Sequence, residues 1–107
     1  RVSATTVRVP VKGGHSLSVN ASFKKPFSMK DVILLLTSFP GLKLSETGPD
    51  PGFVTPLEAE GTNPVYVSRI RRDLSRENTL DMWIVADNLR KGAALNAVQI
   101  AEKLLLF

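Results

Sequence analysis

The chain has 107 residues, of which 43% are hydrophobic and 22% charged, and it carries a net charge of +4. This composition is typical of one globular domain, and it excludes a disordered chain; no apolar run is long enough for a bilayer-spanning helix. Because cysteine is absent, disulfides, thiolate metal sites and a thiol nucleophile are excluded within these residues.

Two strands joined by a glycine turn are predicted at the start of the chain. Residues 5–11 and 15–23 alternate apolar and polar side chains, which is the pattern of a sheet with one buried face. Pro10 cannot donate a ladder hydrogen bond, so the first strand is expected at a sheet edge or close to the turn. The Gly-Gly pair at 13–14 allows the positive φ of a tight turn.

Two side chains flank this turn and could perform chemistry. His15 is the only histidine in the chain, and Arg8 precedes it by seven positions. A guanidinium can bind a carboxylate through two parallel hydrogen bonds, and an imidazole can transfer protons near neutral pH. A solvated arginine and an ordinary turn histidine are the alternatives, and the spacing alone leaves both readings open.

A helix and a short strand are predicted next. Ser28 is a good N-cap, and Asp31 completes a variant of the capping box. Residues 32–36 are apolar nearly all round, which predicts a mostly buried helix. The Pro-Gly pair at 40–41 ends it, and residues 42–45 form a short strand.

The segment 47–63 is rich in glycine and proline and is expected to be a long loop. Loops of this length are often functional or lie at an interface, and a plain surface loop is the alternative.

Residues 65–72 are predicted to form a strand with arginines on both faces, Arg69 and Arg71 on one and Arg72 on the other. Some of these arginines are expected to meet carboxylates, for example across a subunit boundary, and simple solvation is the alternative. No aromatic residues interleave with them, as stacking on nucleic-acid bases would need. We therefore expect no nucleic-acid partner.

The end of the chain is predicted to be a central strand at 80–86 followed by a long helix. Asp87 or Asn88 is expected to cap the helix. Two cations, Arg90 and Lys91, lie in its first turn, where the helix dipole disfavours them, and this indicates a site for an anionic or polar ligand. Small and apolar side chains form one stripe along the helix: Leu89, Ala93, Ala97, Ala101 and Leu104.

Four motifs, in order along the chain, resemble the aspartate-semialdehyde dehydrogenase family. They are RVPVKGGHS at 8–16, TPLEA at 55–59, SRIRRD at 68–73 and ADNLRKGAALNAVQIAE at 86–102. The resemblance implies an α+β fold with a mixed, largely antiparallel sheet and two main helices, of the family's C-terminal type. Residues 1–86 would belong to the catalytic and dimerisation domain, and residues 87–107 would form a helix that packs on a nucleotide-binding domain absent from this chain.

The same resemblance implies a function for the parent protein. Family members reduce aspartyl-β-phosphate to aspartate β-semialdehyde with NADPH, through a cysteine thioester, in amino-acid biosynthesis. Arg8 matches the arginine that binds the substrate α-carboxylate, and His15 matches the general acid/base. Asn88, Arg90 and Gly92 match the segment beside the nicotinamide. Phosphate is released, no metal is involved, and the nucleophilic cysteine lies outside this chain.

The resemblance also sets the expectations for cofactor, partners and location. NADP would be bound mainly by a domain absent from this chain, which looks like a piece of a longer protein and is expected to be inactive alone. The parent is expected to be a cytoplasmic homodimer or larger homo-oligomer, with no membrane partner. Two alternatives stay open: a related N-acetyl-glutamyl-phosphate reductase, and a non-catalytic dimerisation module of the same fold.

Overall fold

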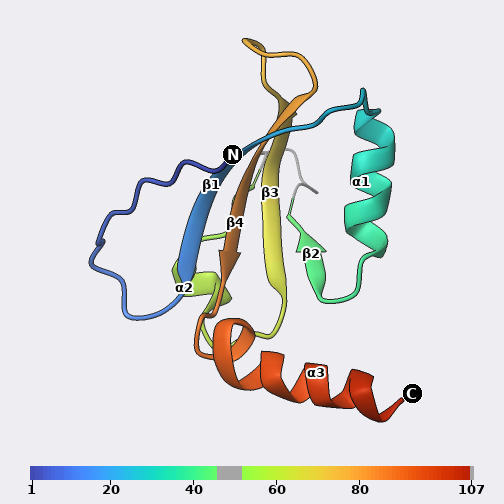
Figure 1. Ribbon diagram of the computed structural model, residues 1–107. Coiled ribbons are helices and arrows are strands. Elements are labelled where there is room, and N and C mark those ends of the chain that lie inside the picture. Colours follow the sequence, from blue (N-terminus) through green and yellow to red (C-terminus); the bar gives the residue numbers. More distant parts are fainter. Residues whose placement is uncertain (46–51, 107) are drawn as a thin grey trace.

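The structure is a computed structural model that describes residues 1–45 and 52–106, and a four-stranded sheet forms its centre (Figure 1). The strand order is β1-β4-β3-β2, with β4 antiparallel to both neighbours and β2 parallel to β3. The elements in chain order are β1 (His15–Ser22), α1 (Met29–Ser38), β2 (Leu42–Leu44), α2 (Pro56–Ala59), β3 (Val65–Arg72), β4 (Thr79–Ala86), η1 (Arg90–Ala94) and α3 (Leu95–Leu105). The predicted mixed, largely antiparallel sheet with two main helices is confirmed.

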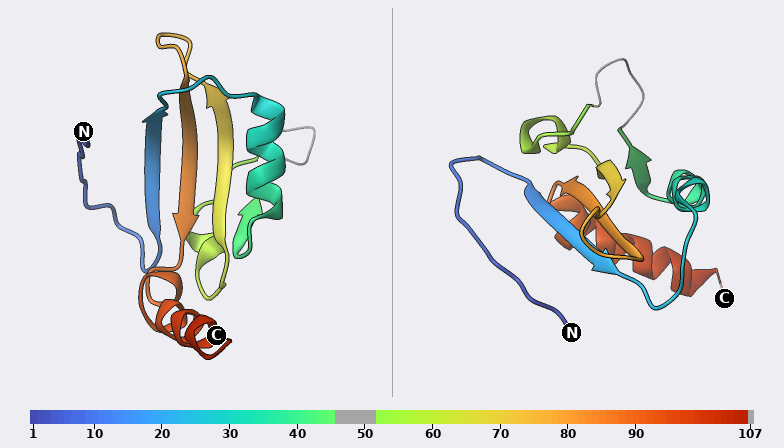
Figure 2. Two further views of the ribbon diagram at one scale, coloured as in Figure 1. Left: turned by 45° about the vertical axis from the view of Figure 1, so that its right-hand side comes forward. Right: turned by 90° about the horizontal axis from the view of Figure 1, so that it is seen from above.

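Each face of the sheet carries one small core, and the two helices α1 and α2 lie on opposite faces (Figure 2). Val67, Ile70 and Leu80 form the core on the side of α1. Val85 packs with Ala59 of α2 on the other side, together with Val54, Tyr66 and Trp83. Because β4 contributes to both cores, its predicted central position is confirmed.

The strand predicted at residues 5–11 is wrong, because this segment is exposed and forms no ladder. Pro10 supplies no N–H, and the amide of Val11 donates locally to the carbonyl of Val9 at 2.9 Å. This bond closes a three-residue γ-turn around Pro10. The segment therefore runs beside the sheet as extended chain without joining it (Figure 1).

The helix α1 begins where Ser28 predicts, but it is not mostly buried. Ser28 is the N-cap residue, although its side chain makes no capping hydrogen bond. Val32 and Leu36 pack on the sheet, whereas Leu34 is 66% exposed. A helix on one face of a single sheet buries only one stripe, and the described residues include no second layer to cover the other.

A β-bulge in β3 corrects the predicted alternation of its arginines. Ser68 pairs with Trp83 and Arg71 with Asp81, so two residues of β3 oppose one of β4. Arg69 takes a left-handed φ of 52°. This extra residue moves Ile70 to the face of the α1 core, where it is 8% exposed. An unbroken strand would have turned arginines toward that core instead.

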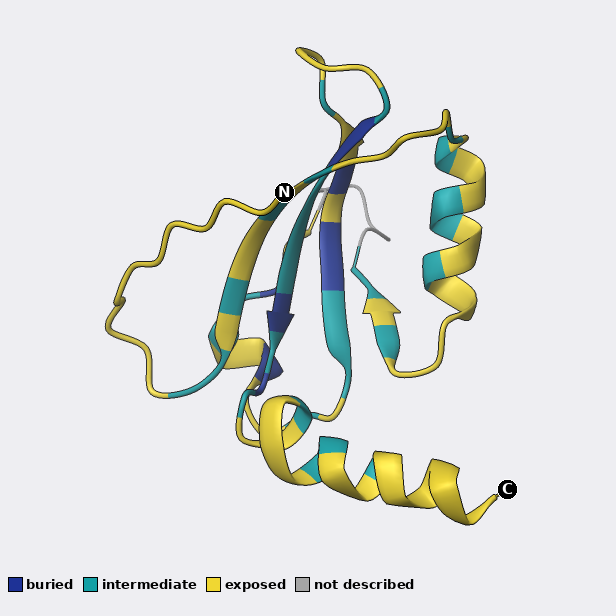
Figure 3. Cartoon of the chain, in the orientation of Figure 1, coloured by how far each residue is buried: buried dark blue, intermediate teal, exposed yellow. Residues whose placement is uncertain are grey.

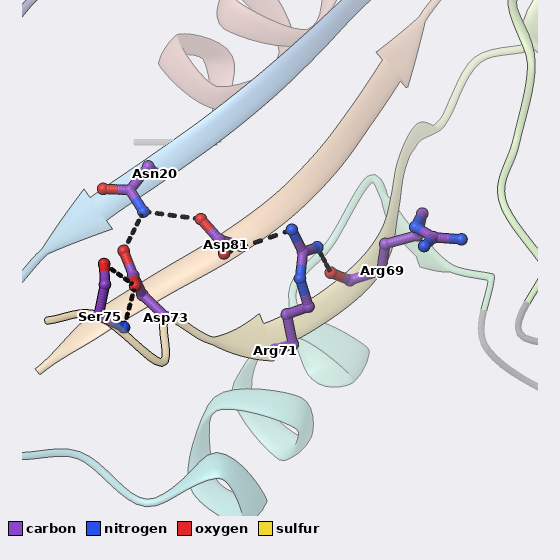
Figure 4. A network of polar contacts seen from close by, with 6 residues as sticks. All are labelled: Asn20, Arg69, Arg71, Asp73, Ser75 and Asp81. Atoms are coloured by element: carbon purple, nitrogen blue, oxygen red, sulfur yellow. Dashed lines mark hydrogen bonds and ion pairs between the residues drawn. The ribbon is translucent and has the colours of Figure 1, made fainter. Parts of the chain in front are cut away.

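Arg71 of β3 meets a carboxylate of the same chain, that of Asp81 on the neighbouring strand β4. The Nη2 atom of Arg71 is 3.3 Å from Oδ2 of Asp81, whereas Arg72 lies over the ring of Phe27 at 4.5 Å. Figure 4 shows Arg69 pointing away from this ion pair.

Much apolar surface stays exposed at the two ends of the chain (Figure 3). Leu17 of β1 is 55% exposed, so the predicted buried face of that strand is covered only in part, and Leu104 of α3 is 72% exposed. No helix within the described ranges is long and apolar enough to cross a membrane.

Candidate functional site

His15 is the first residue of β1 and lies directly after a tight glycine turn. It pairs with Ala86 at the end of the β1–β4 ladder. Gly14 has a φ of 85°, so the predicted turn with positive φ is confirmed at this position. A Cβ atom at Gly14 would lie 3.1 Å from Cβ of Pro56, closer than ordinary contact. Only glycine therefore fits between α2 and the start of β1.

Asn88 joins the turn before His15 to the end of the chain. The backbone N–H of Gly14 donates to Oδ1 of Asn88 at 3.0 Å, across a separation of 74 residues. The two motifs that could be read most clearly in the sequence thus meet at one end of β1 and β4.

Asp87, and not Asn88, caps the final helical segment. Its Oδ1 atom accepts hydrogen bonds from the amides of Leu89 at 2.8 Å and Arg90 at 3.2 Å. Its Oδ2 atom accepts the amide of Gly61 at 2.8 Å. The bond from Gly61 is the main reason that the pKa of Asp87 is lowered, against the opposing effect of burial, and the residue is only 7% exposed. Asp87 therefore stays ionised and holds three backbone groups in place.

The segment after Asn88 forms a π-helical turn, η1, before α3 begins. The amide of Ala94 donates to the carbonyl of Leu89 at 3.2 Å, five residues back. Within this wide turn Gly92 is exposed, and a Cβ atom there would lie 3.7 Å from Cβ of Asn88. Arg90 reaches the other way, and its Nη1 atom donates to Oδ1 of Asn63 at 2.8 Å. Such π turns occur often at functional sites.

The structure does not bring Arg8 to this cluster. Arg8 lies in the exposed segment before the turn, and across residues 1–45 and 52–106 its side chain makes no hydrogen bond or ion pair. The roles assigned to Arg8 and His15 stay predictions. His15, Asn88, Arg90 and Gly92 come from one end of the sheet, and Arg8 completes no contact with them.

The short helix α2 is the part of the site that was not predicted from the sequence. It lies within the segment 47–63, which was predicted to be a long loop. Residues 46–51 lie outside the described residues. The backbone N–H of Thr55 donates to Oε2 of Glu58 at 2.7 Å, and the hydroxyl of Thr55 does so at 2.8 Å. The backbone bond is the larger reason that the pKa of Glu58 is lowered. Thr55, Pro56 and Glu58 are a capping box with proline in the first turn, so the signal was present.

The described side chains hold no group of three or more histidine and carboxylate residues that could bind a metal ion.

Comparison with known proteins connects this geometry to a family. The family model described as "Semialdehyde dehydrogenase, dimerisation domain" matches residues 1–91. The chain is 50% identical over 105 residues to an aspartate-semialdehyde dehydrogenase of Rickettsia typhi, covering 98% of this chain and 31% of the relative. It is 52% identical over 102 residues to that of Streptomyces akiyoshiensis, covering 95% of this chain and 28% of the relative.

Solved structures agree with the sequence relatives. The aspartate semialdehyde dehydrogenase II of Vibrio cholerae, complexed with ASA, superposes with a TM-score of 0.81 at 41% identity. The match covers 92% of this chain and 29% of that one. A probable aspartate-semialdehyde dehydrogenase from Pseudomonas aeruginosa has a TM-score of 0.79 at 36% identity, with coverage of 90% and 28%. The chain thus spans less than a third of the length of these relatives.

Proposed function

Because this chain belongs to the semialdehyde dehydrogenase dimerisation-domain family, we propose that it is the C-terminal part of an aspartate-semialdehyde dehydrogenase. The observation that carries the proposal is the hydrogen bond from Gly14 to Asn88. It joins the motif at 8–16, which contains His15, to the motif at 86–102, which contains Asn88. Substrate and cofactor can share one site only if these two motifs lie together.

In the proposed reaction a cysteine thiolate outside this chain attacks the acyl phosphate of aspartyl-β-phosphate, and phosphate leaves. The nicotinamide cofactor would be held mainly by residues outside this chain, and when bound it would supply a hydride. His15 would handle the protons of the thiol and of the oxyanion, and its exposed place at the end of β1 allows an approach by both. Arg8 would bind the substrate α-carboxylate through its planar fork.

The residues present fit a nicotinamide near the start of the final helix. Gly92 leaves backbone accessible in the π turn, and a Cβ atom at this position would lie 3.7 Å from Cβ of Asn88. Arg90 stands at the same turn and is exposed. These three residues would form one wall of the cofactor site.

We also propose that the parent is a cytoplasmic homodimer or larger homo-oligomer. The matching family model describes a dimerisation domain, and Leu17 of β1 and Phe23 directly after this strand are exposed. The sheet that contains β3 would supply part of the contact between subunits.

The test is which semialdehyde the full-length protein that carries this chain turns over. With aspartate β-semialdehyde, phosphate and NADP, we expect reduction of NADP at a rate proportional to enzyme. Turnover of N-acetyl-glutamate semialdehyde alone would support the related reductase. Folding and dimerisation without turnover of either substrate would support the non-catalytic module.

A further inference from the structure

The hydrogen bond between Gly14 and Asn88 stands where the sheet ladder stops. β1 and β4 pair as far as His15 and Ala86. One residue beyond, the amide of Gly14 donates to a side chain instead of a backbone carbonyl. Since a backbone N–H can only donate, the group facing it must be the amide oxygen of Asn88, and its NH₂ group points elsewhere.

The acceptor is held on rigid backbone. Asp87, next to Asn88, binds the amides of Gly61, Leu89 and Arg90 through its two carboxylate oxygens. These bonds tie the end of β4 to the loop after α2 and to the start of η1. The side chain of Asn88 therefore reaches Gly14 from a fixed origin.

The donor is held from its other side as well. Pro56 lies so close to Gly14 that a Cβ atom would meet its Cα at 3.3 Å and its carbonyl oxygen at 3.4 Å. The glycine is thus enclosed between α2 and Asn88. Removing the bond to Asn88 would free the turn on one side only. We therefore expect His15 to be displaced while the turn stays folded.

We propose that Asn88 is a positioning residue for His15, acting through its side-chain oxygen on the amide of Gly14. The inference rests on the proposed function, in which His15 moves the protons. No side-chain hydrogen bond orients His15 within residues 1–45 and 52–106, so the backbone at the turn sets where the imidazole stands. A displacement of about 1 Å in a catalytic group costs about a hundredfold in rate.

Two substitutions in the full-length protein separate the oxygen of Asn88 from its NH₂ group. Asn88→Asp keeps an acceptor for Gly14 and removes both N–H donors, whereas Asn88→Leu removes acceptor and donors at similar volume. We expect Asn88→Leu to lower kcat by about 10- to 100-fold, and Asn88→Asp to lower kcat, read on the plateau of its pH profile, by a clearly smaller factor. A loss of kcat in Asn88→Asp equal to that in Asn88→Leu would overturn the proposal.

The Michaelis constant for NADP reports on the other possible role. Asn88 could instead act only by binding the nicotinamide through its NH₂ group. In that case both variants would raise this constant by the same factor and leave kcat unchanged. That outcome also contradicts positioning. Asn96→Leu is the matched control, because it replaces the same residue type in α3, away from the turn, and we expect it to leave kcat unchanged.

Hydrogen–deuterium exchange of the peptide containing Gly14 tests the contact without relying on turnover. We expect faster exchange in Asn88→Leu than in Asn88→Asp, and unchanged exchange in Asn96→Leu. If the parent protein turns over no semialdehyde, the proposed function fails while this measurement still reports on the contact. Equal exchange in the Leu and Asp variants would overturn the positioning role even in an active enzyme.

Discussion

The side-chain amide of Asn20 donates a hydrogen bond of 2.8 Å to Oδ2 of Asp73 and thereby joins the edge strand β1 to the turn between β3 and β4 (Figure 4). The same Nδ2 atom donates to Oδ1 of Asp81 at 2.7 Å. Asp81 also pairs with Arg71. One amide on β1 thus bridges two carboxylates that would otherwise repel each other, and three strands are tied together on this face.

Replacing Asn20 should therefore destabilise the sheet at its outer edge. We expect Asn20→Ala to lower the free energy of unfolding by about 1 kcal/mol, because two hydrogen bonds to charged acceptors at an exposed site are lost. Urea titration of the chain measures this. Ser18→Ala is the control, since Ser18 is exposed on the same face of β1, and a loss as large in that variant would contradict a specific role for the bridge.

Acid should weaken the fold through Asp73. Hydrogen bonds from Ser75 and then from Asn20 lower the pKa of Asp73 to about 2. A carboxyl group whose pKa is lower in the folded state stabilises the fold above its ordinary pKa of about 3.9, and this contribution is lost as the pH falls toward 2. Melting temperatures between pH 5 and pH 2 should fall less steeply in Asp73→Asn than in the unchanged chain. Parallel curves would show that Asp73 does not contribute to the acid response.

The predicted substrate contact of Arg8 can be tested with a conservative change in the full-length protein. Arg8→Lys keeps the charge and loses the two-pronged geometry. We expect the KM for the semialdehyde to rise roughly tenfold or more, as the loss of one charge-assisted contact of about 1.5–3 kcal/mol implies. An unchanged KM would remove Arg8 from the substrate site, in keeping with its exposed place in this structure.

The predicted proton transfer by His15 has a different kinetic signature. His15→Ala in the full-length protein should lower kcat by about 10²- to 10⁴-fold with a milder effect on KM. A pH profile of kcat is the measurement. Near-normal turnover at every pH would show that His15 is only a turn residue.

The chain by itself should assemble but not catalyse. It contains no cysteine to carry the acyl group, so we expect no turnover. Its sequence also has no glycine-rich fingerprint between a strand and a helix to hold the pyrophosphate, so we expect no tight binding of NADP. The exposed Leu104 and Leu105 of α3 favour self-association. Light scattering at tens of micromolar should show a dimer or a larger species, and a clean monomer would contradict this.

Replacing both of these leucines with glutamate separates two ways of assembling. Dissociation of the variant would place the contact on α3, whereas an intact dimer would place it on the sheet. Calorimetry that detected micromolar NADP binding by the chain alone would contradict the expectation that it does not bind NADP tightly.

Local patterns predicted the elements well where one residue type decides the backbone. Strict alternation predicted β1 over 15–23, and the structure has His15–Ser22. Glycine at position 14 predicted the turn, and Ser28 predicted the start of α1. In each case steric limits or a helix cap act within a few residues, so the element can be predicted without knowing any contact distant in sequence.

The parts that could not be predicted depend on contacts distant in sequence. Alternation at residues 5–11 resembles that of a strand, but a ladder needs a free partner edge, and Pro10 leaves a γ-turn instead. The bulge at Arg69 follows from the need to bury Ile70 beside Leu80 of β4. Asn88 was a candidate cap, and only the fold shows that its side chain lies at Gly14, 74 positions earlier.

The π turn of η1 also shifts the helical phase between the residues before it and α3. An α-helix advances about 100° per residue, and a π turn accommodates one residue more than an α turn. A helical wheel drawn continuously from Leu89 is therefore out of phase by about one position in α3. Deleting one residue between 90 and 94 would convert the π turn into an α turn and would leave the face that α3 presents unchanged.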